Sequence, residues 1–141
     1  MKTKIIIISI HPQHINKILS GEKLYEYRRR IPLDIKYIVI YATVPIRKVV
    51  AIVEVDCVIK DTPIALWNLT HRYSGISYDF FMNYFYGLTE AHAIKFANIY
   101  KLGTPVDIAV IDGIRCAPQA YSYVNESFEV LCDKFHIELN S

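Results

Sequence analysis

The stretch that decides the fold is residues 5–30, which have the sequence IIIISIHPQHINKILSGEKLYEYRRR. Its first six residues are almost all β-branched and predict a buried central strand over 5–10. A short helix begins at His11 and Pro12, because proline suits the first helical position, and Gly21 is placed to end it in a left-handed conformation. Residues 23–29 are expected to leave this turn as a second strand.

Short strands and helices are expected along the rest of the chain. Residues 37–43 predict a third strand, and the alternation over 49–58 predicts a long strand that bends around a small barrel. Thr62 and Ser77 resemble N-caps of two short helices, the second ended by Gly87. Residues 91–100 and 121–124 indicate two further strands, 107–111 either a short strand or a helical turn, and 126–137 a terminal helix. A single α+β domain on a small mixed barrel is the economical architecture.

The composition fits a compact domain with a core. The chain has 141 residues, of which 52% are hydrophobic, too many for a disordered segment. The apolar run over 5–8 is too short to cross a membrane, and no small-residue cleavage site follows it. We therefore expect a cytoplasmic protein without a membrane partner. Its three cysteines are widely spaced, which predicts reduced, mostly buried thiols.

The net charge of +2 conceals an uneven distribution along the chain. Residues 1–48 hold ten basic and three acidic side chains, a balance of +7, whereas the remainder holds six basic and eleven acidic ones, a balance of −5. Such asymmetry suggests a positive face for an anionic partner such as nucleic acid. A scatter of solvated charges over the surface explains the same numbers equally well.

Residues 21–30, GEKLYEYRRR, contain the densest group of chemically versatile side chains. In an extended conformation Glu26 and Arg28 project from one face, and Tyr25 and Tyr27 from the other. The charged pair then either points to solvent, as on a protected edge strand, or lines a polar cleft where the two side chains pair. The residues alone favour the exposed edge strand over the polar cleft.

The sequence resembles the ASCH domains of the PUA-like superfamily, of the free-standing type. The central motif is Gly21-x-Lys23-x-x-Glu26-x-Arg28, preceded by Ser9-Ile10-His11-Pro12. Further similar segments follow in order over residues 41–45, 49–51, 73–77, 92–95 and 117–123. The resemblance is strongest over 5–124 of the expected single domain 1–141, with 125–141 as a C-terminal extension that is expected to be helical.

The resemblance implies a PUA-like mixed β-barrel of five to six strands with three to four short helices. It implies a domain that binds RNA or a modified nucleoside through a basic and polar cleft. No metal and no cofactor are expected, because the sequence has no pair of metal-ligating motifs and no phosphate-binding fingerprint. The binding residues expected on this basis are Lys23, Glu26, Arg28, Arg29, Arg30, Tyr41, Thr43, Arg47, Ser74 and Tyr123.

Two alternative functions accompany this hypothesis. Some PUA-like relatives hydrolyse acetylated cytidine, and an ASCH protein is described as a ribonuclease. In the amidohydrolases a threonine stands where this chain has Glu26, so a hydrolase here needs Glu26 as general base and Lys23 as oxyanion stabiliser. The second alternative is a domain that binds other proteins, as in transcriptional coregulators.

Other candidate residues favour structural roles. His11 and His14 lie three residues apart without a second metal-ligating pair, so a capping or surface role is expected. His92 is expected to pack or to line a cleft. The aromatic residues of segment 78–86, at helical spacing, are expected to face the core.

Overall fold

The computed structural model describes residues 3–139, so the expected domain ends at residues 1–2 and 140–141 lie outside the described residues. A six-stranded sheet of order β2-β5-β4-β3-β1-β6 forms its centre. β1 and β3 are parallel, and the other neighbouring strands are antiparallel. The strands are β1 (Lys4–Ile10), β2 (Tyr25–Arg28), β3 (Ile35–Ala42), β4 (Lys48–Asp61), β5 (Ala91–Val106) and β6 (Ser122–Val124).

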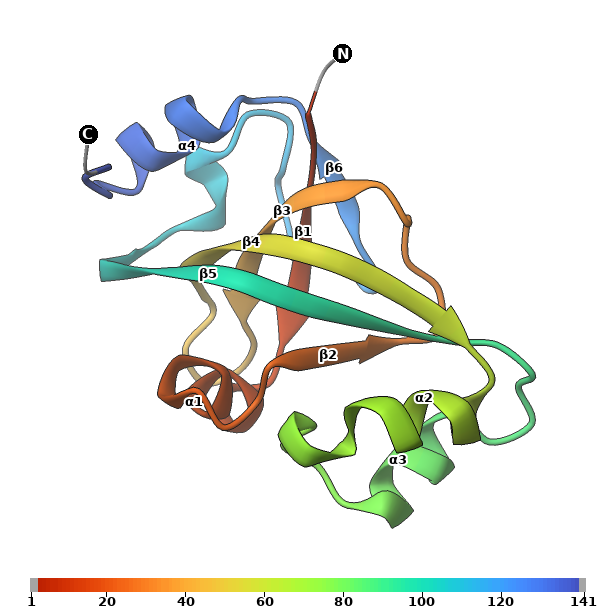
Figure 1. Cartoon of the computed structure of the whole chain (residues 1–141). Coiled ribbons are helices and arrows are strands. Elements are labelled where there is room, and N and C mark those ends of the chain that lie inside the picture. Colours follow the sequence, from red (N-terminus) through yellow and green to blue (C-terminus); the bar gives the residue numbers. More distant parts are fainter. Residues whose placement is uncertain (1–2, 140–141) are drawn as a thin grey trace.

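Four α-helices surround the sheet (Figure 1). They are α1 (Pro12–Ser20), α2 (Pro63–Thr70), α3 (Tyr78–Tyr84) and α4 (Phe128–Lys134). The helices α2 and α3 lie together near one end of the long β4–β5 ribbon, and α4 lies above its other end in this view. The hydroxyls of Thr62, Ser77 and Ser127 accept backbone N–H groups at the starts of α2, α3 and α4, as expected of N-caps.

The isoleucine run of β1 explains why this strand lies inside the sheet. Ile6 and Ile8 pack in one apolar cluster, while Ile5 and Ile7 pack in a second cluster on the opposite face. Successive side chains of a strand point to opposite faces, so a strand buried on both faces is apolar throughout. A third cluster, built around Tyr27, Leu66, Phe81 and Phe85, attaches α2 and α3 to β2 and β5.

The expected α+β fold, with its number of strands and helices, is confirmed. Within residues 3–139 the sheet curls without closing, because β2 and β6 remain its two edges. β5 continues to Val106, past the expected end at residue 100, because it pairs along β4 as far as Val49. The segment 107–111 contains a short 3₁₀ turn, Ile108–Val110, rather than a strand.

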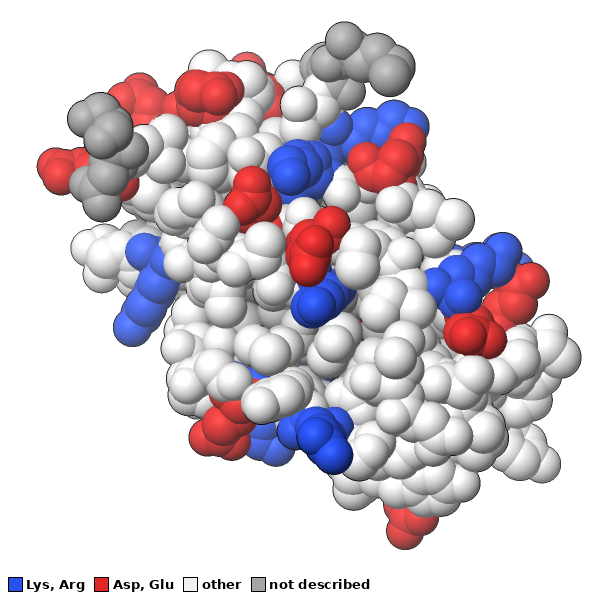
Figure 2. Space-filling view, viewed as in Figure 1, with Lys and Arg blue, Asp and Glu red and all other residues white. Residues whose placement is uncertain are grey.

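Two further sequence-based expectations concern the cysteines and the charges. The prediction of mostly buried thiols is wrong, since Cys57 and Cys116 are exposed and only Cys132 is buried. The charge asymmetry is partly cancelled across the fold, because Lys36 pairs with Glu54 from the acidic part of the chain. On the face drawn in Figure 2, basic and acidic side chains alternate and form no single positive surface.

Across residues 3–139, none of the helices is both long enough and apolar enough to cross a membrane.

Candidate functional site

The turn after α1 directs Lys23 into the protein. Gly21 ends the helix with a φ of 86°, a left-handed conformation that glycine adopts without steric cost. The backbone N–H of Lys23 then donates to the carbonyl of Lys17 (3.0 Å), and that of Leu24 to the carbonyl of Tyr73 (2.9 Å). These bonds hold the start of β2 between α1 and the segment that precedes α3.

Glu26 joins two cations beside this turn. Its Oε2 accepts a hydrogen bond from Nη2 of Arg28 at 2.9 Å, and its Oε1 lies 3.7 Å from Nζ of Lys23. The same Nη2 donates to the carbonyl of Ser9 at 2.9 Å, and Lys23 donates to the carbonyl of Ser74 at 2.6 Å. The interpretation of Glu26 and Arg28 as solvent-directed edge charges is therefore wrong; the two side chains pair, and Glu26 is only 9% exposed.

Lys23 is the most deeply buried charged side chain of this group. The residue is 1% exposed, and its Nζ lies 5.1 Å from the centre of the Tyr27 ring. Burial lowers the pKa of Lys23 because the charged ammonium loses its hydration, and the nearby Glu26 carboxylate opposes this shift. Its stem packs against Gly75, where an added Cβ would come within 2.9 Å of the Lys23 Cβ.

A small cavity of about 200 Å³ opens above this ionic group, and we call it the small cavity. Its polar wall includes Lys23, Glu26 and Arg28. The rest of its lining comes from β1, α1, β2 and the α3 region: Ser9, Ile10, His11, His14, Tyr27, Ile76, Phe80 and Tyr84. The lining of the small cavity thus combines a cation-rich ionic group with aromatic and aliphatic side chains.

His14 has a different place from the capping or surface role that the sequence predicts. It lines the cavity, and its Nδ1 is buried without a hydrogen-bond partner among the described residues. Burial lowers the pKa of His14, so the neutral imidazole prevails at pH 7. His11 is the N-cap residue of α1, but its side chain makes no capping bond and contacts Thr43 instead (3.2 Å).

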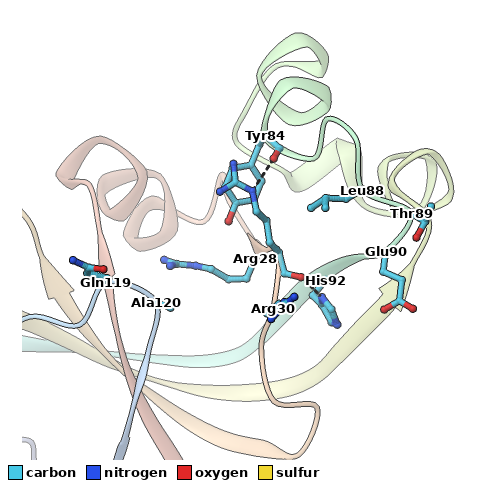
Figure 3. Close-up of a pocket in the computed structure, with 10 residues that line it drawn as sticks. Arg28, Arg30, Tyr84, Leu88, Thr89, Glu90, His92, Gln119 and Ala120 are labelled. Atoms are coloured by element: carbon cyan, nitrogen blue, oxygen red, sulfur yellow. Dashed lines mark hydrogen bonds between the residues drawn. The ribbon is translucent and has the colours of Figure 1, made fainter.

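A larger cavity of about 610 Å³ adjoins the small one, and we call it the arginine cavity. Arg28, Arg29 and Arg30 line it, together with Tyr84, Leu88, Thr89, Glu90, His92, Gln119 and Ala120. Figure 3 shows Arg28 extending from β2 toward Gln119 and Ala120, while Arg30 lies near His92. The guanidinium of Arg29 stacks on the ring of Tyr84 (4.3 Å), and its Nε donates to the Tyr84 carbonyl (3.0 Å).

The aromatic residues of α3 divide between core and cavity. Phe81 and Phe85 are buried in the third cluster, as expected. The expectation of a core position is wrong for Phe80, which is 51% exposed and lines the small cavity, and Tyr84 lines both cavities. Phe80 and Tyr84 are four residues apart, and this i, i+4 spacing places them on one stripe of the helix. That spacing is the signal by which the sequence could have revealed them.

The remaining expected site residues lie at different places. Thr43 is near the rim of the small cavity through its contact with His11, and Ser74 contributes the carbonyl that holds Lys23. Tyr41 packs against the second apolar cluster, which contains neither Lys23 nor Glu26. Arg47 is exposed in the turn between β3 and β4, and Tyr123 is half exposed on the edge strand β6. The structure thus brings together seven of the ten expected residues and leaves Tyr41, Arg47 and Tyr123 elsewhere; the seven are Lys23, Glu26, Arg28, Arg29, Arg30, Ser74 and, at the rim, Thr43.

Tyr27 fixes the opposite face of β2 to α2. Its hydroxyl donates to Oγ1 of Thr70 (2.7 Å), because the Thr70 hydroxyl itself donates to the Leu66 carbonyl. Burial raises the pKa of Tyr27 to about 12 from its usual 10.0. Below pH 10 the tyrosine is protonated in both states; above it the unfolded chain loses the proton first, so stability falls as the pH rises toward 12.

We predict that Tyr27→Phe removes this alkaline loss of stability. Two pKa units correspond to about 2.7 kcal/mol, and the lost hydrogen bond costs about 1 kcal/mol at pH 8. The variant should therefore be less stable than the parent at pH 8 and more stable above about pH 11, as measured by urea unfolding. The half-exposed Tyr123→Phe is the control and should follow the parent at every pH. A constant difference between the Tyr27→Phe variant and the parent would contradict the prediction.

Among residues 3–139, no group of three or more His, Cys, Asp or Glu side chains is arranged to hold a metal ion.

Known proteins resemble this chain in sequence and in fold. No protein-family model matches the sequence. The ASCH domain-containing ribonuclease of Zymomonas mobilis subsp. mobilis is 28% identical over 125 residues, which cover 85% of this chain and 84% of the relative. The crystal structure of ASCH from Zymomonas mobilis matches with a TM-score of 0.81 and 26% identity, over 98% of this chain and 96% of the other. The chain is thus similar to ASCH domain proteins in both sequence and fold.

The fold of the chain also matches the crystal structure of a serine-to-alanine variant of the Zymomonas mobilis ASCH protein. Its crystal structure has a TM-score of 0.79 and 28% identity, over 87% of this chain and 89% of the other. In this chain, the motif by which the sequence resembles the ASCH domains forms the connected ionic group of Lys23, Glu26 and Arg28.

Proposed function

We propose that this domain binds single-stranded RNA, with the phosphate backbone in the arginine cavity and one nucleotide in the small cavity. The observation that carries the proposal is that the two cavities adjoin, because Arg28 and Tyr84 line both. A chain of alternating phosphates and bases needs such a pair of neighbouring sites, one cationic and one partly apolar.

The chemistry of the two cavities supports this arrangement. Guanidinium groups bind phosphate oxygens with paired N–H donors, and three consecutive arginines line the larger cavity. Phe80 and Tyr84 offer aromatic faces for a base in the smaller one. Because a base inserts only when it is unstacked, the arrangement favours single strands over duplexes.

RNA cleavage is the second part of the proposal, and the name of the Zymomonas relative favours it. His14 is the neutral imidazole of the small cavity and serves as proton acceptor. It takes the proton of a ribose 2′-hydroxyl, whose oxygen bonds to the adjacent phosphorus, while the bond to the 5′-oxygen breaks and that oxygen takes a proton from water. Lys23 is nearly inaccessible and both Glu26 oxygens face cations, so these two residues orient Arg28.

The binding proposal predicts a salt-dependent affinity that decreases when Arg30 is replaced. Each phosphate contact of a single strand contributes about 0.7 to the slope of log affinity against log salt. In fluorescence anisotropy with a labelled 12-nucleotide RNA, Arg30→Ala should reduce affinity about fivefold and this slope by about 0.7. Lys101→Ala, on the part of β5 that pairs with Ala51, is the matched control. Undetectable or salt-insensitive binding by the parent protein would overturn the proposal.

The cleavage step has a separate test. The parent protein and a His14→Gln variant are incubated with end-labelled single-stranded RNA, and fragments are resolved on a gel. We expect fragments ending in a 2′,3′-cyclic phosphate from the parent, with rates at least tenfold lower for the variant and unchanged RNA affinity. Equal rates would remove His14 from the mechanism. Release of acetate from acetylated cytidine, without RNA fragments, would favour the amidohydrolase alternative instead.

A further inference from the structure

A third concave surface lies beyond the small cavity, on the far side of residues 74–76. It has a volume of about 580 Å³ and is open to solvent. Its lining includes the basic side chains Lys17 and Arg72, the acidic Glu22, His71 and the half-exposed Tyr73. We call it the Arg72 cavity, and neither the proposed phosphate site nor the proposed nucleotide site uses it.

The Arg72 cavity lies next to the small cavity, on the other side of residues 74–76. Ile76 lines both, and the wall between them is the segment Ser74–Gly75. Two lysines hold this wall: Lys23, in the turn after α1, donates to the Ser74 carbonyl, and Lys17 of α1 donates to the Gly75 carbonyl at 2.8 Å. A ligand that leaves the small cavity over Ile76 therefore meets a second cationic surface at once.

The side chains along this route suit a nucleic-acid strand. Phe80 and Tyr73 are each 51% exposed and stand at the small cavity and the Arg72 cavity respectively. Exposed aromatic rings between cationic groups are the pattern by which proteins bind successive nucleotides of a single strand. With Lys17 and Arg72 against Glu22, the lysine, arginine and glutamate side chains of the lining carry a net positive charge.

We propose that the RNA-binding surface continues across Ile76 into the Arg72 cavity, where Arg72 contacts a phosphate of a nucleotide beyond the one held in the small cavity. This inference rests on the proposed RNA binding and extends it from a two-cavity site to a three-cavity path. It follows that a long oligonucleotide uses Arg72, whereas an oligonucleotide that ends in the small cavity does not.

The test compares two lengths of labelled oligouridylate, a trinucleotide and a 12-mer, on the parent protein and on Arg72→Ala. We expect the variant to bind the 12-mer about fivefold more weakly, with a salt slope smaller by about 0.7, and to bind the trinucleotide as the parent does. Arg72→Glu should enlarge the loss for the 12-mer alone. Thermal unfolding verifies that both variants fold, and Lys101→Ala is again the control.

Each other outcome overturns the inference in a distinguishable way. Equal losses for both lengths would place Arg72 at the nucleotide site, and unchanged binding of the 12-mer would exclude the path across Ile76. If the parent binds neither oligonucleotide, the proposed function itself fails and this inference fails with it. If the parent binds the 12-mer and Arg30→Ala weakens it while Arg72→Ala does not, only the extension is lost.

Discussion

Replacing Glu26 by glutamine is expected to lower the free energy of unfolding by about 3 kcal/mol. The substitution keeps the shape of the side chain but removes the anion between Lys23 and Arg28, whose side chains are only 2% and 16% exposed. Removing one partner of a buried ion pair typically costs 3–5 kcal/mol, because the remaining charge stays desolvated and unpaired. Urea unfolding at pH 7 measures the difference, with an unchanged m-value as the sign of an unchanged unfolded state.

The matched control for this substitution is Glu54→Gln. Glu54 pairs with Lys36 at 3.6 Å, and the Lys36 side chain is 52% exposed, so the loss should stay below about 1 kcal/mol. The penalty of Glu26→Gln should also be smaller at pH 10 than at pH 7. The pKa of Lys23 is already lowered by burial, and removal of the Glu26 attraction lowers it further, so the ammonium becomes neutral at high pH. Equal losses for the two variants would mean that the ionic group is solvated in solution.

The elements of this fold are predictable where a local pattern determines them. The isoleucine run of β1, the proline at the start of α1 and the hydroxyl caps of α2 and α3 each have a cause within a few residues. The length of β5 has no such local cause, because its last residues form a strand only through their pairing with β4. Pro105 and Gly103 lie in this part of β5, and their low intrinsic strand preference concealed the extension.

The candidate site was predictable in part for the same reason. Alternation along β2 places Glu26 and Arg28 on one face, which the sequence alone indicates. That this face is buried depends on contacts distant in sequence, such as the bond from Lys23 to the Ser74 carbonyl, 51 residues away. The inclusion of Gln119 in the arginine cavity likewise depends on the position of the segment before β6. No short-range pattern contains this information.

Those distant contacts make the backbone at Gly75 a part of the site. The carbonyls of Ser74 and Gly75 accept hydrogen bonds from Lys23 and Lys17, and the Gly75 Cα faces the Lys23 stem. A displacement of this segment therefore moves the group that anchors Lys23, and with it Glu26 and Arg28. Segment 74–76 is also the wall between the small cavity and the Arg72 cavity. One short segment thus links the stability of the ionic group to the shape of the proposed RNA path.

Gly75→Ala is accordingly expected to destabilise the protein by about 3 kcal/mol. The φ of Gly75 is +70°, and a left-handed conformation costs a residue with a Cβ roughly 1–2 kcal/mol. The added Cβ would lie 2.9, 3.0 and 3.1 Å from Cβ, Cγ and Cδ of Lys23. These atoms form the inner stem of a side chain held at its far end by Ser74 and Glu26, so relief requires that the ionic group shifts.

Gly87→Ala separates the two contributions. Gly87 has a φ of +79°, but no atom lies within 4 Å of the position that its Cβ would take, so this variant should lose only the backbone cost of about 1–2 kcal/mol. Urea unfolding should therefore rank Gly75→Ala below Gly87→Ala by a further 1–2 kcal/mol or so, in the range of overpacking costs. Truncation of the stem in a Lys23→Ala background should remove only part of that additional loss, because the contacts with Cγ and Cδ disappear while the 2.9 Å contact with the Lys23 Cβ remains. Equal losses of stability for the two glycine variants would contradict the prediction. They would show that Lys23 moves away from the added Cβ at no energetic cost, and that the contact between Gly75 and Lys23 does not fix the wall of the small cavity.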